Sequence, residues 1–471
     1  MASSVLICAL LVVLSFPAAS AHSAQPSTLI SFTREPSCRR CLLAPYRQRH
    51  GHTEECAQCM AFFLASFGLP SETDHFVTTR DGCILRLIRI SNPGRPVVFL
   101  QHPLLASSWI WLTGAPLMSS AIALHQAGYD VWMGNSRGSL FSANHTSMSV
   151  DSEDFWSYTW QHMAMYDIPA SIQYVLTHTR SHADGLIYVG HSQGTTQFFA
   201  SQSMPLDKWR HDSEHHSLQG VWTAGDVPAN KAVKLFVALA PIAYINHMSS
   251  RAFALLSRLG IAGAVERLGI RQFPAAEAEV TLLREVLKAF CGGSMTPFCV
   301  AVDQLVGGNG NNQHINTTTM DWSLQWFPDT TSVMDMNHYE QLFLQKRFGL
   351  YDYGWFGNIQ HYGTMTAPAF QLEQWPTDIP VALFRGEYDE FASAADVDQI
   401  KQRLPPGTVV YDKTYTGFGH VTWLMGDEST AYWLDDLRAL LHQYADAAGQ
   451  GEHPTATAPA TAVRRGTPLW I

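Results

Sequence analysis

A short apolar stretch that runs directly into a serine-centred motif constrains the fold of this chain more than any other feature. Residues 186–189 (LIYV) are apolar or strand-forming and predict a buried β-strand. Gly190, Ser192 and Gly194 follow in the pattern G-x-S-x-G, and residues 195–200 are compatible with a helix. A serine on such a strand-to-helix turn sits at a strained corner with its hydroxyl exposed. The glycines are needed because a Cβ at either position would collide with the neighbouring strand or helix.

Strand and helix patterns alternate along much of the chain. The strands are expected at residues 75–79, 83–90, 96–101, 129–133, 186–190, 235–241, 379–385 and 409–411, and the first two are joined by an Asp-Gly turn. The helices are expected at residues 119–126, 163–177, 195–200 and 430–444. This alternation predicts an α/β fold with a doubly wound, mostly parallel sheet. Between residues 242 and 373 it is replaced by helical stretches (residues 280–290 and 339–346) and aromatic-rich loops, which predict an inserted cap above the serine.

Composition excludes some partners and permits others. The 471 residues are 46% hydrophobic, which is sufficient for a large core with an insertion. The formal net charge of −10 and the lack of a basic run argue against a nucleic-acid partner. The 14 Trp, 16 Tyr and 24 Phe residues permit an apolar substrate pocket.

The amino terminus and two sequons indicate the secretory pathway. Residues 4–16 form an apolar run of signal-peptide length, and Ala19, Ser20 and Ala21 offer a cleavage site before His22. The run is too short to span a bilayer comfortably, although no Lys or Arg precedes it and a retained anchor stays an alternative. We expect a secreted protein or one of the lysosome or vacuole. The sequons predict glycosylation at the residues Asn144 and Asn316.

The cysteines are spaced in two ways that carry information. Four of them form C-x-x-C, 14 residues, C-x-x-C, namely Cys38, Cys41, Cys56 and Cys59. Behind a signal peptide this spacing favours disulfides, whereas in a cytosolic protein it would indicate zinc; zinc and redox chemistry remain alternatives here. Cys291 and Cys299 are close enough in sequence to close a small loop, and we expect a bridge between them. Cys83 is left over as a candidate buried free thiol.

The serine requires two partners from later in the chain. Its hydroxyl becomes nucleophilic when an imidazole takes its proton, and a carboxylate must orient that imidazole. In α/β-hydrolases these groups follow in the order Ser, Asp, His on loops after later strands. Asp389 follows one predicted strand, and His420 follows the next and precedes the final helix. We therefore predict a triad of Ser192, Asp389 and His420, and we interpret Asp378 and Asp412 as structural.

Ester hydrolysis also requires two N–H donors for the oxyanion of the tetrahedral intermediate. One is expected to be the backbone N–H of Gln193, directly after the nucleophile. The other is expected near residues 102–104, where Pro103 has no N–H and Leu104 can donate. We expect His191, inside the motif, to pack rather than to react.

Four stretches of this sequence resemble the acid lipases, the family of gastric lipase, lysosomal acid lipase and their plant and insect relatives. They are residues 102–107 (HPLLAS), 127–138 (AGYDVWMGNSRG), 166–170 (YDIPA) and 189–196 (VGHSQGTT). The resemblance covers roughly residues 75–444 and is looser across the predicted cap. It implies the same triad and the same oxyanion donors, a Cys291–Cys299 bridge, and neutral-lipid esters as substrates. No metal or organic cofactor is implied, and Pro103 departs from the family's usual glycine.

These observations predict an α/β-hydrolase with the following organisation. We expect a signal peptide at residues 1–21, a Cys-rich segment at 22–70, a first core part at 71–241 with a surface insertion at about 206–230, a cap at 242–373, a second core part at 374–446 and a disordered tail at 447–471.

The expected function is a serine lipase that cleaves acylglycerols or sterol esters through an acyl-enzyme and contacts a lipid droplet or membrane surface transiently. One alternative is an esterase or acyltransferase for shorter or soluble esters. The other is a non-catalytic lipid-binding protein on a hydrolase scaffold. The sequence does not fix the oligomeric state.

Overall fold

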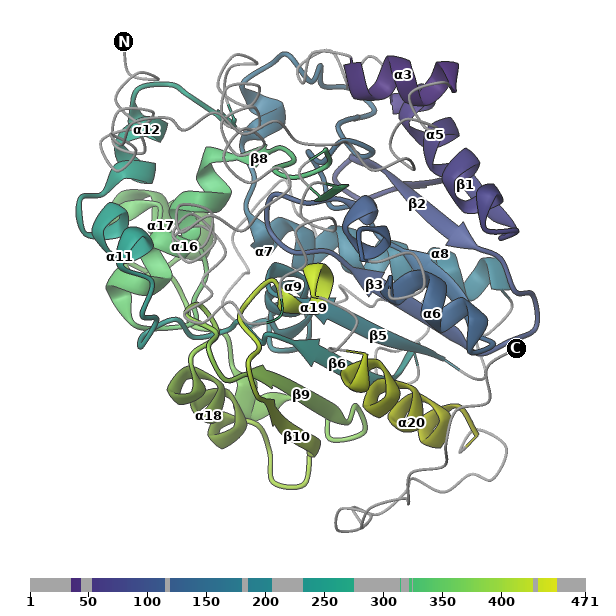
Figure 1. Cartoon of the computed structure of the whole chain (residues 1–471). Helices are drawn as coiled ribbons and strands as arrows, with labels where there is room; N and C mark the ends of the chain where they lie inside the picture. Colours follow the sequence, from purple (N-terminus) through teal and green to yellow (C-terminus); the bar gives the residue numbers. More distant parts are fainter. Residues whose placement is uncertain are drawn as a thin grey trace, which may run out of the picture.

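An eight-stranded sheet lies at the centre of the computed structural model, which describes residues 35–43, 53–114, 119–179, 185–205, 232–274, 314, 322–323, 325–426 and 431–446 (Figure 1). Its strands, in spatial order, are β1 (Ser71–Thr78), β2 (Ile84–Ile90), β4 (Asp130–Met133), β3 (Val97–Gln101), β5 (Leu186–His191), β6 (Val233–Leu239), β9 (Val381–Gly386) and β10 (Val409–Tyr415). The pairs β1–β2 and β2–β4 are antiparallel and all other pairs are parallel. This confirms the predicted doubly wound, mostly parallel sheet.

Helices cover both faces of this sheet, which is why nearly every residue of its central strands is buried. α6 (Ser120–Gln126) and α20 (Tyr432–Asp446) lie on one face, and α8 (Ile168–Thr179) and α9 (Gln193–Gln202) lie on the other (Figure 1). The predicted helix at residues 163–177 begins with a π-helical turn (Met163–Asp167) that leads into α8. α18 (Ala394–Arg403), which the sequence analysis did not predict, is capped by the Ser393 hydroxyl, which accepts from the N–H of Asp396 at 3.2 Å.

Two disulfides join the helices of the Cys-rich segment. α3 (Pro36–Leu43) and α5 (Thr53–Ser66) are linked by Cys38–Cys59 and Cys41–Cys56, and all four side chains are buried. The disulfide prediction is confirmed for these cysteines, and the zinc alternative is wrong because no thiolate remains to bind a metal. Cys83 is a buried free thiol, as predicted. Cys291 and Cys299 lie outside the described residues.

The described parts of the predicted cap are mainly helical. α11 (Arg251–Arg258), α12 (Ile261–Arg267), α16 (Val333–Gln345) and α17 (Gly354–Tyr362) group beside one end of the sheet (Figure 1), together with an antiparallel pair, β7 (Gln272–Phe273) and β8 (Thr331–Ser332). The Tyr339 hydroxyl of α16 donates to the Thr196 hydroxyl of α9 at 3.2 Å, so α16 lies against the helix that follows the serine. The predicted helix at residues 339–346 overlaps α16.

Several predictions fall on residues that the structure does not describe. These are the signal peptide, the insertion at about 206–230, the helix at 280–290, the sequon at Asn316 and the tail at 447–471. Asn144, the other sequon residue, is described and exposed. Within the described ranges, we find no helix that combines the length and the apolar character needed to cross a bilayer.

Two of the stretches that resemble the acid lipases meet in a buried ion cluster. The Arg137 guanidinium donates to Asp167 at 2.6 and 2.9 Å and to Asp81 at 2.6 and 3.0 Å. Burial raises the pKa of Asp167 despite the neighbouring guanidinium. Burial acts in the same direction on Asp81, but there the charge of Arg137 prevails and holds the pKa at about 2. Arg137 therefore has a structural role, because it links the β1–β2 turn to the start of α8.

Candidate active site

Ser192 occupies the sharp turn between β5 and α9. Its backbone has φ +52° and ψ −116°, a conformation that is rare for a residue with a side chain and that stores strain. A Cβ on Gly190 would lie 2.7 Å from the backbone of Gly194, and a Cβ on Gly194 would overlap the carbonyl oxygen of Gln101. Both glycines are therefore required for the close approach of β3, β5 and α9, for the steric reason that the sequence pattern predicts.

Asp389 and His420 reach Ser192 from the loops that follow β9 and β10. The Nε2 atom of His420 lies 2.8 Å from the Ser192 Oγ, and its Nδ1 atom lies 2.9 and 3.0 Å from the two oxygens of Asp389. Oδ1 of Asp389 also accepts the N–H groups of Phe391 at 3.0 Å and Ala392 at 2.7 Å. These bonds fix the carboxylate so that it can orient the imidazole, and the structure brings all three predicted residues into one hydrogen-bonded line.

Backbone contacts hold the acid loop against the histidine loop. The N–H of Tyr388 donates to the Phe418 carbonyl at 2.8 Å, and the N–H of Gly417 donates to the Glu387 carboxylate at 3.0 Å. A Cβ on Gly386, the last residue of β9, would lie 2.7 Å from the same Phe418 carbonyl. These contacts fix the two loops against each other and so support the distance between the carboxylate and the imidazole.

His191 packs beneath His420. Its side chain is fully buried, and burial together with the nearby His420 lowers its pKa far below the usual value, so the ring is neutral. Its Nε2–H donates to the carbonyl oxygen of His420 at 2.8 Å. His191 therefore positions the backbone of the histidine loop and takes no proton from the serine.

The candidate oxyanion donors are the backbone N–H groups of Leu104, in the loop after β3, and of Gln193, directly after Ser192. Neither the N–H of Leu104 nor that of Gln193 donates to another group in the described part of the chain. The neutral ring of His102 fixes the corner before Leu104, because its Nδ1–H donates to the Pro103 carbonyl at 2.8 Å and its Nε2 accepts the N–H of Ser136 at 2.9 Å. Burial lowers the pKa of His102 to about 4, which keeps this pattern intact at neutral pH.

One polar residue near the serine was missed by the sequence analysis. Asp335 of α16 is fully buried and accepts the side-chain amide of Gln193 at 3.2 Å, the N–H of Trp160 at 2.6 Å and the hydroxyl of Thr331 at 2.9 Å. Burial raises its pKa to about 7. In sequence, Asp335 lies three residues after Ser332, which is the spacing of a helix cap. Its N–H does donate to the Ser332 hydroxyl, so Asp335 takes part in the cap as well.

The remaining candidates are accounted for. Asp412 accepts from Arg385 and Lys401 and is structural, as predicted. No group of three metal-ligating side chains occurs around Ser192 within the described ranges. The arrangement at Ser192 is suited to acyl transfer, because a hydroxyl, an imidazole and a carboxylate form one hydrogen-bonded line and the N–H of the next residue, Gln193, is free to donate.

Two family models match the amino-terminal half of the core. Residues 60–115 match a partial alpha/beta-hydrolase lipase region, and residues 96–200 match the alpha/beta hydrolase fold.

Curated relatives match over most of the chain. "Triacylglycerol lipase 1" of Arabidopsis thaliana is 29% identical over 76% of this chain and 84% of its own length. "Lysosomal acid lipase/cholesteryl ester hydrolase" of Homo sapiens is 30% identical over 81% and 90%, respectively. "Gastric triacylglycerol lipase" of Homo sapiens is 30% identical over 84% and 93%.

Proposed function

Since this chain belongs to the acid lipase family of α/β-hydrolases and is a carboxylic-ester hydrolase, we propose that Ser192, His420 and Asp389 are its catalytic triad. The observation that carries the proposal is the unbroken line of hydrogen bonds from the serine Oγ through both ring nitrogens to the buried carboxylate. Such a line is what nucleophilic activation of a serine requires.

The reaction proceeds by acyl transfer to the serine and then to water. Ser192 Oγ attacks the ester carbonyl carbon while His420 Nε2 accepts the hydroxyl proton, and the imidazolium is stabilised by Asp389. The tetrahedral intermediate collapses, the ester C–O bond breaks and Nε2 returns the proton to the leaving alcohol. A water molecule then attacks the acyl-enzyme with His420 as base, which releases the fatty acid and restores the serine.

The negative charge that develops on the carbonyl oxygen is bound by the N–H groups of Leu104 and Gln193. Neither donates to another group within the described residues, and Gln193 directly follows the serine. Preorganised donors of this kind typically contribute about 10²–10³ in rate each. Pro103 does not remove a donor, and the hydrogen bonds of His102 support the geometry of this corner.

We assign neutral-lipid esters, acylglycerols or sterol esters, as the substrate class. The names of the relatives support this, since two are triacylglycerol lipases and one is a cholesteryl ester hydrolase. Transient contact with a lipid surface fits the exposed apolar side chains on α11 and α17 and at the carboxyl ends of α11 and α12, namely Leu255, Leu259, Leu268, Trp355, Phe356 and Ile359. The two disulfides fit an oxidising compartment, and we propose that residues 1–21 are removed as a signal peptide and that the mature protein is secreted or lysosomal.

One assay separates this proposal from its alternatives. Emulsified triolein and cholesteryl oleate are compared with a soluble short-chain ester, using the wild-type protein and Ser192→Ala. We expect activity to rise sharply on emulsions and the variant to lose about 10⁴–10⁶ in kcat. Preference for the soluble ester would favour the esterase alternative, and a wild-type protein that binds lipid without hydrolysis would favour a lipid-binding protein.

A further inference from the structure

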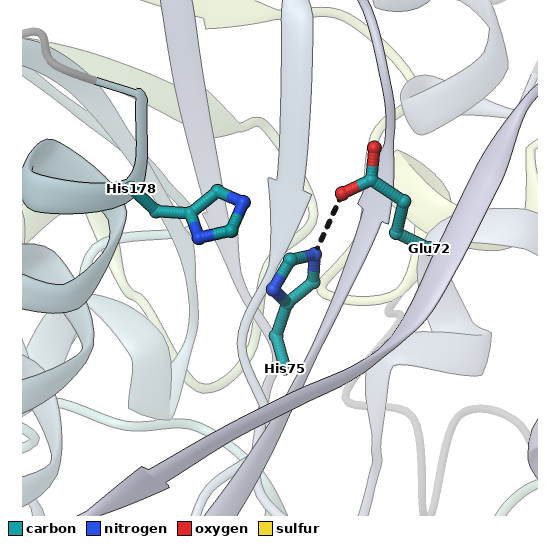
Figure 2. A group of neighbouring side chains, drawn as sticks. All are labelled: Glu72, His75 and His178. Atoms are coloured by element: carbon teal, nitrogen blue, oxygen red, sulfur yellow. Dashed lines mark hydrogen bonds and ion pairs between the residues drawn. The ribbon is translucent and has the colours of Figure 1, made fainter.

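Three side chains far from Ser192 bring together two imidazoles and a carboxylate. Glu72 and His75 belong to β1, and His178 belongs to the last turn of α8 (Figure 2). One nitrogen or oxygen atom of each lies within 4.8 Å of the corresponding atoms of the other two. No step of ester hydrolysis uses these residues.

An irregularity in the sheet is what places Glu72 and His75 side by side. Residues three apart in a regular strand point to opposite faces. Between these two, however, β1 advances three residues while β2 advances two, since Glu72 pairs with Arg89 and His75 pairs with Leu87. The extra residue is a β-bulge, which turns both side chains toward α8. Bulges commonly re-aim a side chain for a purpose other than sheet pairing.

His75 is oriented in the way that metal-ligating histidines are. Its Nδ1 lies 3.1 Å from the Tyr174 hydroxyl and its Nε2 lies 2.9 Å from Oε2 of Glu72 (Figure 2). When Nδ1 carries the proton and donates to Tyr174, the lone pair of Nε2 is free for a metal ion. His178 is exposed, and its ring centre lies 4.7 Å from that of His75, so an ion can enter from solvent.

The charged groups around Glu72 have a net negative charge, which favours binding of a cation. Arg89 is the neighbouring positive group, and Asp130 neutralises it through two hydrogen bonds of 2.9 Å. Arg89 also donates to Glu72 at 3.0 Å, but these two carboxylates and one guanidinium still sum to one negative charge. A divalent ion bound to Glu72 would therefore meet a net attraction.

We propose that Glu72, His75 and His178 form a zinc site that fastens β1 to α8. Two imidazole nitrogens and one carboxylate oxygen suit Zn²⁺, with water as the fourth ligand. Asp130 is the first residue of β4, so the site lies at the amino ends of the parallel strands, whereas Ser192, Asp389 and His420 follow the carboxyl ends of theirs. The site is therefore remote from Ser192. When zinc binds, the proton of the neutral His75 ring moves from Nε2 to Nδ1. The Nδ1–H then donates to the Tyr174 hydroxyl, and Nε2 binds the metal.

Zinc titration of the full-length chain after treatment with a chelator tests this proposal. At pH 7.5 we expect one Zn²⁺ per protein chain with micromolar or tighter affinity and a rise in melting temperature on binding. Co²⁺ should give the visible absorption of a low-coordinate site. His178→Ala, which alters an exposed side chain, should weaken Zn²⁺ binding at least tenfold, while the matched variant His442→Ala on α20 should bind as the wild type does.

Two results would overturn the site. One is the absence of stoichiometric zinc binding by the wild type below about 10 μM, and the other is equal affinity in His178→Ala. If the zinc-free His178→Ala protein has a lower melting temperature than the zinc-free wild type, the substitution has also affected the fold, and zinc binding by Glu72→Gln is then measured in the same way. An unchanged zinc affinity in Glu72→Gln would equally contradict the proposal.

Discussion

The Nε2 atom of His420 lies 2.8 Å from the Oγ of Ser192, although 228 positions separate the two residues in the chain. Local sequence cannot produce this contact; it follows from the order β5-β6-β9-β10, which places the ends of these parallel strands along one edge of the sheet. The His191 side chain adds a direct link, because it extends from the serine turn to the backbone of His420. The predictions below follow from this arrangement and from the buried charges around it.

Asp389→Asn should abolish most of the activity and leave the fold intact. The amide presents an N–H to His420 and stabilises the wrong tautomer, which typically costs about 10⁴ in kcat. Turnover of a soluble ester and the thermal melting temperature are measured together. Asp412→Asn, which alters a carboxylate that binds Arg385 and Lys401, is the control and should keep kcat within about threefold. Equal losses in the two variants would argue against a specific role for Asp389.

Asp335 should make the folded protein more stable at acidic than at neutral pH. Its pKa is about 7 in the folded protein against 3.8 in the unfolded chain, so below pH 3.8 both states hold the proton. As the pH rises from about 4 to about 7, the unfolded chain loses this proton first, and the free energy of unfolding falls by up to about 1.4 kcal/mol per pH unit.

Asp335→Asn should remove this part of the pH dependence. Oε1 of Gln193 has no hydrogen-bond partner, so a flip of the Gln193 amide allows it to pair with the new amide. Denaturant midpoints at pH 4.5 and 7 are compared for the wild type, Asp335→Asn and the exposed control Asp151→Asn. The same change of midpoint with pH in all three proteins would show that Asp335 does not titrate in this window.

Arg137→Met should destabilise the fold strongly, because it leaves the carboxylates of Asp81 and Asp167 without their buried cation. Removing one partner from such a cluster typically costs about 3–5 kcal/mol. Arg403→Met removes a half-exposed ion pair with Glu373 and should cost less than about 1 kcal/mol. Chemical denaturation measures both. A loss of less than about 1 kcal/mol for Arg137→Met would mean that the cluster contributes little to stability.

The double substitution Trp355→Ser with Phe356→Ser should lower activity on emulsified triolein and leave turnover of a soluble ester unchanged. These adjacent side chains of α17 are 46% and 78% exposed and offer an apolar contact for a lipid surface. Phe76→Ser removes an exposed aromatic side chain from β1 and serves as the control. If the α17 variant keeps full activity on emulsions, or loses activity on both substrates alike, α17 is not the lipid-contact surface.

Much of the core was predictable because its signals are local. The strand of residues 186–189 with its glycine-flanked serine, and the Asp-Gly turn between β1 and β2, each specify their geometry over a few residues. The positions of Asp389 and His420 followed from the order of strands that any sheet of this type imposes. Only their mutual distances had to come from the structure.

Other features depend on contacts that sequence periodicity does not report. The π-helical turn at Met163–Asp167 has the same apolar spacing as an ordinary helix, so it was read as the start of α8. Asp335 has the pattern of a helix cap, and its approach to Gln193 arises from the packing of α16 against α9. Glu72 and His75 share a face because of a β-bulge, which cannot be deduced from the alternation of β1 alone.

The central claim is that the Ser192 hydroxyl is the nucleophile and that His420 activates it. A lipid-like p-nitrophenyl phosphonate, which reacts with activated serines, tests this claim with intact-mass and peptide mass spectrometry. We predict one phosphonyl group per wild-type chain, on the peptide that contains Ser192, with hydrolysis lost in proportion to labelling and with no labelling of His420→Ala. Label on another residue, or full hydrolytic activity in a completely labelled Ser192 protein, would contradict the account.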